Sequence, residues 1–119
     1  MKPKRILVVD DEHCITDTLV AILRLSGYDA VGSYCAECAI KDCENFNPEL
    51  VITDVSMPGM NGVDLAMLLK GQHPGCRFLL ISGQTSTVDL LEKARNEGYG
   101  FDLLSKPVHP ADLLSRIAA

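Results

Sequence analysis

The chain has 119 residues, of which 47% are hydrophobic, so its size and composition suit one globular domain with a continuous core. Its 11 basic and 16 acidic residues give a net charge of −5, which argues against sustained contact with a polyanion such as nucleic acid. No apolar run approaches membrane-spanning length, and the run after the basic start is too short for a signal-peptide core. We therefore expect a single domain over residues 1–119 that contacts neither nucleic acid nor a membrane.

Five short runs of mainly apolar residues predict five strands. Three of the runs are almost entirely apolar, as expected for strands that are covered on both faces. Two weaker runs complete the set. The predicted strands are residues 6–9, 30–34, 50–53, 78–81 and 101–104.

Between these runs, apolar residues recur at helical spacing, so that each intervening segment could bury one face. In the third such segment, Leu65, Leu68 and Leu69 form the predicted apolar face. Residues that commonly end or begin helices mark the boundaries: Ser26-Gly27, Pro48, His73-Pro74-Gly75 and Gly98 as stops, and Pro110 as the start of the last helix. Alternating strands and helices predict an α/β fold with right-handed crossovers and a central parallel sheet.

Polar side chains stand directly after the predicted strands. Asp10 and Asp11 follow the first strand, Asp54 the third, Ser82 the fourth and Lys106 the fifth. In an open α/β sheet, binding residues gather beyond the carboxyl ends of the strands. Clustered carboxylates repel one another unless a divalent cation or an ammonium group lies close by, and oxygen ligands of this kind suit Mg²⁺. The sequence therefore predicts an acidic site, with Lys106 as its ammonium and room for Mg²⁺.

Acids at strand ends could instead be simple helix caps, because unpaired N–H groups at a helix start favour them. For Glu12 this explanation suffices. For Asp10, Asp11 and Asp54 it explains each residue singly, but not why all three fall at strand ends together with a serine and a lysine. We interpret His13, which follows the acids, as a solvated residue at a helix start.

Four sequence blocks resemble the signatures of receiver domains from bacterial response regulators. The blocks are VVDDE at residues 8–12, DVSMPGMNG at 54–62, ISG at 81–83 and SKP at 105–107. They occur in the family's order, cover the whole chain, and include the specific pattern Asp-x-x-Met-Pro-x-Met-x-Gly. The resemblance implies a doubly wound, flavodoxin-like sheet of five parallel strands in the order 2-1-3-4-5, with helices on both faces.

The resemblance also implies a metal site. Asp54 matches the family's phosphoacceptor, which is also a metal ligand, and Asp11 matches the acid that binds Mg²⁺ directly. Asp10 matches the companion acid, which often acts through water. At the position of Ser56, the family uses a backbone carbonyl to complete the protein's share of the Mg²⁺ shell.

Three further residues match positions that handle the phosphoryl group. Ser82 matches the hydroxyl that bonds a phosphoryl oxygen, Gly83 the small residue that leaves access to it, and Lys106 the lysine that pairs with phosphate. The bond between Lys106 and Pro107 is cis in the family. The resemblance thus implies a two-component signalling switch that catalyses its own phosphorylation, from a histidine kinase or phosphotransfer protein, and controls a downstream protein or domain.

One position departs from the family pattern. The family's switch aromatic falls three residues before Lys106, where this chain has Leu103. Leucine cannot donate a hydrogen bond or stack as tyrosine does. Tyr99 and Phe101 lie just upstream and could take a shifted role, but we expect the aromatic function to be absent.

Two other functional classes compete with a phosphorylated switch. A phosphorylation-independent scaffold or dimerisation module is disfavoured by the complete set of acids, serine and lysine, although Leu103 favours it slightly. A flavin-binding or hydrolytic enzyme on the same topology is disfavoured because the chain lacks a glycine-rich phosphate loop and a nucleophile elbow.

The five cysteines are odd in number and unevenly spaced, which suits a compartment where thiols stay reduced, so we expect a cytoplasmic protein. Cys35 and Cys38 form a Cys-x-x-Cys pair, but no second pair or histidine lies nearby in the sequence, and a zinc site is disfavoured. Cys38 stands at a predicted helix start, where a thiol can be modestly reactive. Cys43 is predicted to be a small core residue.

Overall fold

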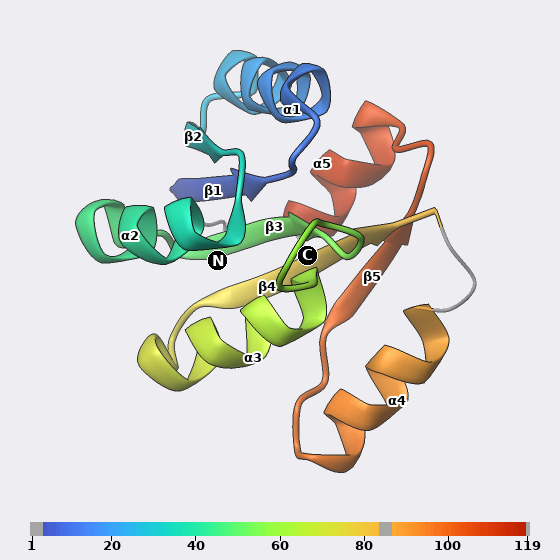
Figure 1. Ribbon diagram of the computed structural model, residues 1–119. Coiled ribbons are helices and arrows are strands. Elements are labelled where there is room, and N and C mark those ends of the chain that lie inside the picture. Colours follow the sequence, from blue (N-terminus) through green and yellow to red (C-terminus); the bar gives the residue numbers. More distant parts are fainter. Residues whose placement is uncertain (1–3, 84–86, 119) are drawn as a thin grey trace.

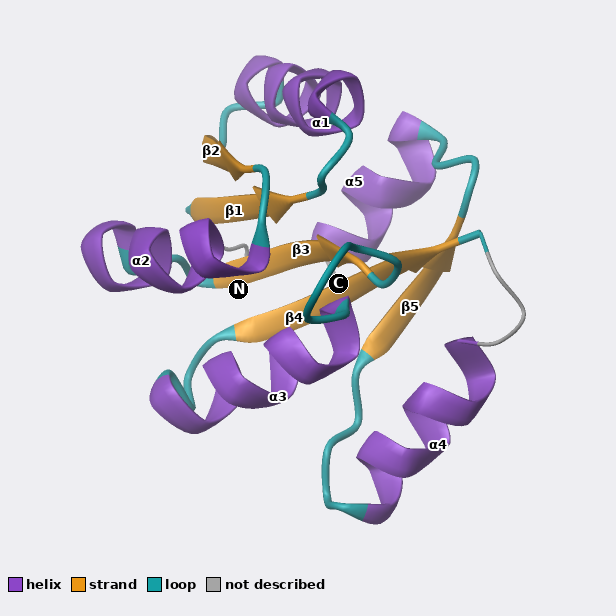
Figure 2. Ribbon diagram, viewed as in Figure 1, coloured by secondary structure: helices purple, strands orange, loops and turns teal. Residues whose placement is uncertain are grey.

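The computed structural model describes residues 4–83 and 87–118. Within these residues, five strands alternate with five helices, as the apolar runs predict (Figure 2). The strands are β1 (Arg5–Val9), β2 (Asp29–Ser33), β3 (Leu50–Asp54), β4 (Arg77–Ser82) and β5 (Asp102–Ser105). The helices are α1 (His13–Leu25), α2 (Ala36–Phe46), α3 (Gly62–Gln72), α4 (Thr87–Asn96) and α5 (Pro110–Ala118).

The strands form one parallel sheet in the order β2-β1-β3-β4-β5, so the expected flavodoxin-like topology is confirmed. Strand order reverses between β1 and β3, and the carboxyl ends of these two strands lie side by side, with Val9 paired to Thr53. The observed strand ends differ from the predicted ones by a single residue at most positions. This topology brings the residues that follow β1 and β3 to one edge of the sheet.

Helices cover both faces of the sheet: α1 and α5 lie on one face, and α2, α3 and α4 on the other (Figure 1). Alternate residues of each central strand enter opposite layers. In β3, Val51 packs with the cluster under α2 and α3, whereas Ile52 packs with the cluster under α1 and α5, and both are fully buried. Burial on both faces explains why the central strands are apolar without alternation.

The helix boundaries follow the predicted punctuation. Asn47 ends α2 in the left-handed conformation, and Asn61 caps α3 by accepting the backbone N–H of Asp64 at 2.9 Å. The predicted apolar face of α3 was partly wrong, because Leu68 is 38% exposed. The buried stripe of α3 runs through Leu65 and its neighbours Gly62, Ala66 and Leu69, and position 68 lies beside it.

None of the helices within the described residues is long and apolar enough to cross a lipid bilayer.

Candidate functional site

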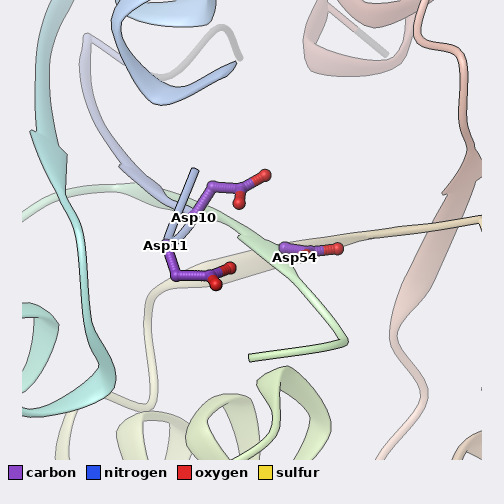
Figure 3. A group of neighbouring side chains, drawn as sticks. All are labelled: Asp10, Asp11 and Asp54. Atoms are coloured by element: carbon purple, nitrogen blue, oxygen red, sulfur yellow. The ribbon is translucent and has the colours of Figure 1, made fainter. Parts of the chain in front are cut away.

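Three carboxylates meet at the carboxyl edge of the sheet. Asp10 and Asp11 follow β1, and Asp54 is the last residue of β3 (Figure 3). Each offers an oxygen atom, and these oxygens all lie within 4.8 Å of one another. Asp10 is 3% exposed and Asp54 is 6% exposed, whereas Asp11 is more accessible. The structure thus brings together the three acids that the sequence predicted.

Asp10 is fixed by hydrogen bonds from three directions. Its carboxylate accepts the backbone N–H of Glu12 at 3.0 Å, and its own N–H donates to the carbonyl of Ser33 at 3.2 Å. Its carbonyl accepts the Thr16 hydroxyl at 2.8 Å. The prediction that Glu12 is a simple cap was wrong in one respect: Glu12 occupies the N-cap position of α1, but its side chain makes no capping hydrogen bond. The cap-like contact runs from the Glu12 backbone to Asp10 instead.

Lys106 supplies the positive charge of the site. Its Nζ lies 3.2 Å from Oδ1 of Asp54 and 3.6 Å from Oδ2 of Asp10. The backbone N–H of Lys106 donates to the carbonyl of Ser82 at 3.0 Å, which ties the end of β5 to the end of β4. The Lys106–Pro107 peptide bond is cis, as the resemblance implied.

The remaining predicted residues also lie at this edge. Ser82 is the buried last residue of β4, and in the strand register its neighbour Ile81 pairs with Asp54. Gly83 is exposed, and a Cβ added there would meet the Lys106 side chain at 3.6 Å, an ordinary contact. Ser56 is exposed two residues after Asp54. The structure therefore gathers every predicted site residue at the carboxyl ends of β1, β3, β4 and β5.

Burial has the largest influence on the pKa values of Asp10 and Asp54. Desolvation raises the pKa of Asp54 above its ordinary value, and nearby Lys106 opposes the rise. Desolvation likewise raises the pKa of Asp10, against the hydrogen bond from Glu12. For Lys106, burial by itself would lower the pKa, but Asp54 and Asp10 outweigh it and raise the pKa. One ammonium, paired with Asp54 and Asp10, thus accompanies a cluster of three carboxylates, which leaves an excess of negative charge in a partly buried pocket.

Two residues that support the site were not predicted from the sequence. Gly62, the first residue of α3, lies so close to β3 that a Cβ would fall 2.1 Å from the carbonyl oxygen of Asp54. Its N–H donates to the carbonyl of Val55 at 2.9 Å. Thr16 is fully buried in α1, where its hydroxyl holds the turn after β1 through Asp10. The only sequence signals were the glycine that ends the 54–62 block and a polar residue on an apolar helix face.

The aromatic residues near β5 point to a packing role. Phe101 precedes β5 and stacks against Tyr99 and, edge to face, against Phe78 near the start of β4. Leu103 pairs with Leu80 in the middle of β5 and is half-buried. Phe101 and Tyr99 therefore lie toward the amino end of the strands, away from Ser82, so a shifted role for them in contact with the site is not supported.

The cysteines differ from the expectation of separate reduced thiols. Cys35 and Cys38 are joined by a disulfide bond in the structure. Their spacing at the start of α2 brings both sulfurs to one side of the first turn, which the sequence pattern alone did not distinguish from a pair of free thiols. Cys43 is buried, as predicted, and desolvation raises the pKa of its thiol to about 12. His13 is exposed, as predicted, and its ring also stacks on Tyr34.

A doubly wound parallel sheet with a cluster of acids and one lysine at its carboxyl edge defines a flavodoxin-like protein with a cation- and phosphate-compatible site. Comparison with known families is more specific. The model of the response regulator receiver domain matches residues 6–118, and the chain belongs to this family. Its homology to response regulators supports a role as a phosphoacceptor in signalling.

Two kinds of known protein are similar to this chain: curated sequences and solved structures. Among curated proteins, the DNA-binding response regulator MtrA of Mycolicibacterium paratuberculosis is 32% identical over 98% of this chain, and 50% of that protein is covered. The alkaline phosphatase synthesis transcriptional regulatory protein PhoP of Bacillus subtilis is also 32% identical over 98% of this chain, with 48% of that protein covered. The chain thus spans about half the length of these curated relatives.

Solved structures give the same assignment. A CheY-like response regulator receiver domain protein from Methanospirillum hungatei superposes with a TM-score of 0.88 at 31% identity, covering 97% of this chain and 90% of that one. The signal receiver domain of an HD domain-containing protein from Pseudomonas fluorescens also has a TM-score of 0.88, at 29% identity, covering 99% and 93%. The flavodoxin-like fold is therefore shared along almost the whole chain.

Proposed function

We propose that the chain is a phosphorylation-dependent switch in which Asp54 accepts a phosphoryl group from a histidine kinase or a histidine phosphotransfer protein. The observation that carries the proposal is the geometry around Asp54. Its carboxylate lies at the end of a buried strand, 3.2 Å from the Lys106 ammonium and beside Asp10 and Asp11. Family membership supports the same role.

The acid cluster fits a divalent cation. Three carboxylates against one ammonium leave about two negative charges uncompensated, and the donor atoms are all oxygen, which a hard ion such as Mg²⁺ prefers. We assign Asp11, Asp54 and the Ser56 carbonyl as its protein ligands, with Asp10 acting as the companion acid. When bound, Mg²⁺ supplies neutralisation of the charge that develops on a transferring phosphoryl group.

The chain's own residues account for the rest of the chemistry. A carboxylate oxygen of Asp54 attacks phosphorus in line with the departing imidazole of the donor, and an acyl phosphate forms as the P–N bond breaks. Lys106 pairs with the phosphoryl oxygens, and the Ser82 hydroxyl donates to one of them. Because Asp10 and Lys106 are positioned in advance by contacts within the chain, little reorganisation is needed when the phosphoryl group arrives.

We extend the proposal to the domain organisation, location and output of the chain. We take residues 1–119 as one receiver domain that works in the cytoplasm, and the net charge of −5 supports the absence of direct contact with nucleic acid or a membrane. The curated relatives named above are DNA-binding or transcriptional regulators twice as long as this chain. We propose that the phosphorylated form controls an output protein or domain of this general kind.

The proposal is tested by incubating the chain with acetyl phosphate and Mg²⁺ and measuring its intact mass. We expect the mass of one phosphoryl group to be added to the wild-type chain and none to Asp54→Asn. Asp29→Asn is the matched control, because Asp29 is an exposed acid at the opposite end of the sheet. Equal labelling of wild type and Asp54→Asn would contradict the proposal.

A further inference from the structure

A pair of cysteines opens helix α2 next to the acid site. Cys35 is the N-cap residue, and its sulfur accepts the backbone N–H of Cys38 at 3.1 Å. The two residues are bonded through their sulfurs, with their Cα atoms 5.2 Å apart, a separation typical of disulfides. Cys38 is exposed and Cys35 is half-buried. The pair is therefore accessible to small reactants.

The other cysteines in the described part of the chain are unsuited to the same chemistry. Cys43 and Cys76 are buried, and desolvation raises the pKa of their thiols to about 12 and about 11, which disfavours the reactive thiolate. Cys14 is exposed but stands alone. At the start of α2, in contrast, two sulfurs lie at the positive end of a helix dipole, which stabilises negative charge.

The bond is poorly placed to serve as a structural staple. It closes a ring of only four residues, which constrains the unfolded chain less than the longer loops that stabilising disulfides usually close. The fold also has two apolar clusters that pack both faces of the sheet without the bond. A disulfide that adds little to stability is better explained by its chemistry.

We propose that Cys35 and Cys38 form a reversible dithiol–disulfide couple that is oxidised by a low-molecular-weight disulfide such as oxidised glutathione. The redox state of this couple changes the preorganisation of the acid site. The adjustment of phosphorylation rests on the function proposed for Asp54. The couple itself, and its structural effect on the residues around Asp10, do not depend on that function.

The reaction proceeds by thiol–disulfide exchange. The exposed Cys38 thiolate attacks one sulfur of oxidised glutathione, forming a mixed disulfide and releasing one glutathione thiolate. The Cys35 thiolate then attacks the Cys38 sulfur, which forms the intramolecular bond and releases the second glutathione. The two protein thiols lose two electrons in total, the glutathione disulfide gains them, and the two thiol protons end on the two glutathione molecules.

The pair is connected to the acid site through the segment that precedes it. Ser33, at the end of β2, accepts the backbone N–H of Asp10 at 3.2 Å. The next residue, Tyr34, stacks on His13 with ring centroids 3.8 Å apart, and its hydroxyl donates to Asp17 at 2.6 Å. Closing the bond at Cys35 restricts this segment, which holds the start of α1 and the turn after β1. The oxidised chain therefore has the more preorganised site.

The first experiment tests the couple. The full chain is equilibrated with oxidised or reduced glutathione, its exposed thiols are alkylated without denaturant, and its intact mass is measured. In Cys14→Ser, which removes the third accessible thiol, oxidation should abolish both alkylation sites without adding glutathione, and reduction should restore them. The wild type should show the same change at Cys35 and Cys38. Cys35→Ser should instead retain one glutathionyl group on Cys38. Alkylation of both Cys35 and Cys38 that persists in oxidised glutathione would overturn the proposal.

The second experiment tests the connection to the site. Two-dimensional amide NMR spectra of the oxidised and reduced chain should differ at Asp10, Asp11 and His13 as well as beside the cysteines. In Cys35→Ser, where oxidation forms only the mixed disulfide at Cys38, the differences should stay beside Cys38. Differences confined to residues 33–40 would overturn the connection. Because these spectra need no phosphodonor, they decide the inference independently of the function proposed for Asp54.

With acetyl phosphate, we expect the oxidised chain to label about threefold faster than the reduced chain, the size of a weak coupling between neighbouring groups.

Discussion

Side chains are buried both in the middle of the sheet and, at Asp10 and Asp54, at its carboxyl edge, yet burial has opposite consequences in the two regions. In the middle of β3, Ile52 is fully buried among apolar side chains, and removing such a side chain from water contributes about 1.5–3 kcal/mol to folding. Two residues further on, burial disfavours the charged form of Asp54 and raises its pKa. The difference teaches that the acids do not stabilise the fold. The apolar core contributes the stability, and the buried charges at the edge lower it.

The largest effect should come from the core. Ile52→Ala deletes a buried side chain that lies between Val8 of β1 and Leu79 of β4 in the strand register. We expect it to lower the free energy of unfolding by about 2–5 kcal/mol, from lost transfer energy and a residual cavity. The measurement is urea denaturation followed by circular dichroism. Leu25→Ala, at a site 88% exposed, is the matched control and should change stability by no more than about 0.5 kcal/mol.

A smaller loss of stability should come from a substitution where α3 contacts the end of β3. Gly62→Ala places a Cβ against the backbone carbonyl of Asp54, which cannot rotate away, so α3 must shift. We expect a destabilisation of about 1–3 kcal/mol, typical of overpacking. Gly83→Ala is the control at the same edge, because its Cβ would make only ordinary contacts with Lys106. Equal stability of the two variants in urea denaturation would show that α3 is free to move away from β3.

At the carboxyl edge, removing a charge should stabilise the fold. Burial raises the folded-state pKa of Asp10 above its ordinary value of 3.8. The stability associated with its protonated form is therefore fully present below pH 3.8 and is lost as the pH rises through the folded-state pKa. At neutral pH without divalent ions, Asp10→Asn should raise the Tm by a few degrees, and the gain should shrink as the pH falls toward 4.

The control for this prediction is Glu92→Gln, which removes the same unit of negative charge from an exposed position on α4. It should leave the Tm unchanged, because no buried carboxylate is relieved. Differential scanning calorimetry in the presence of a chelator measures both variants. A loss of stability in Asp10→Asn at neutral pH would mean that the ion pair with Lys106 outweighs the desolvation of Asp10.

The smallest effect concerns how strongly a change at Asp54 is transmitted to Leu103 in β5. Leu103 fills space beside Leu80 but offers neither a hydroxyl nor a ring. With beryllofluoride and Mg²⁺, we expect clear NMR shifts around Asp54 and Ser82 and modest ones near Leu103, with Leu103→Tyr enlarging the distal response. A deficit of about 1.4 kcal/mol in coupling would lower the active-to-inactive ratio roughly tenfold. Distal shifts that are already large in the wild type would contradict this interpretation.

Much of the fold could be predicted because its signals are local. Apolar runs marked every strand, and the glycines and prolines between them marked the helix ends. The acid site was also predictable, because parallel strands deliver the residues at their carboxyl ends to one edge. Asp10, Asp54 and Lys106 were identified in this way, and the structure brings them together.

The remaining features depend on contacts between segments that are distant in the sequence or on fine local geometry. The need for glycine at position 62 arises from the approach of α3 to β3, and the role of Thr16 from the way α1 crosses the end of β1. The exposure of Leu68 depends on which stripe of α3 meets the sheet. The bond between Cys35 and Cys38 depends on side-chain geometry in the first turn of α2. None of these is encoded in composition or spacing alone.

The central claim is that the phosphoryl group resides on Asp54 rather than on a neighbouring acid. After labelling with acetyl phosphate and Mg²⁺, borohydride reduction converts a phosphorylated aspartate to homoserine, and peptide mass mapping then locates the modified residue. The account predicts homoserine at position 54, with Asp10 and Asp11 unmodified. Homoserine at position 10 or 11, or labelling without any reduced aspartate, would contradict it.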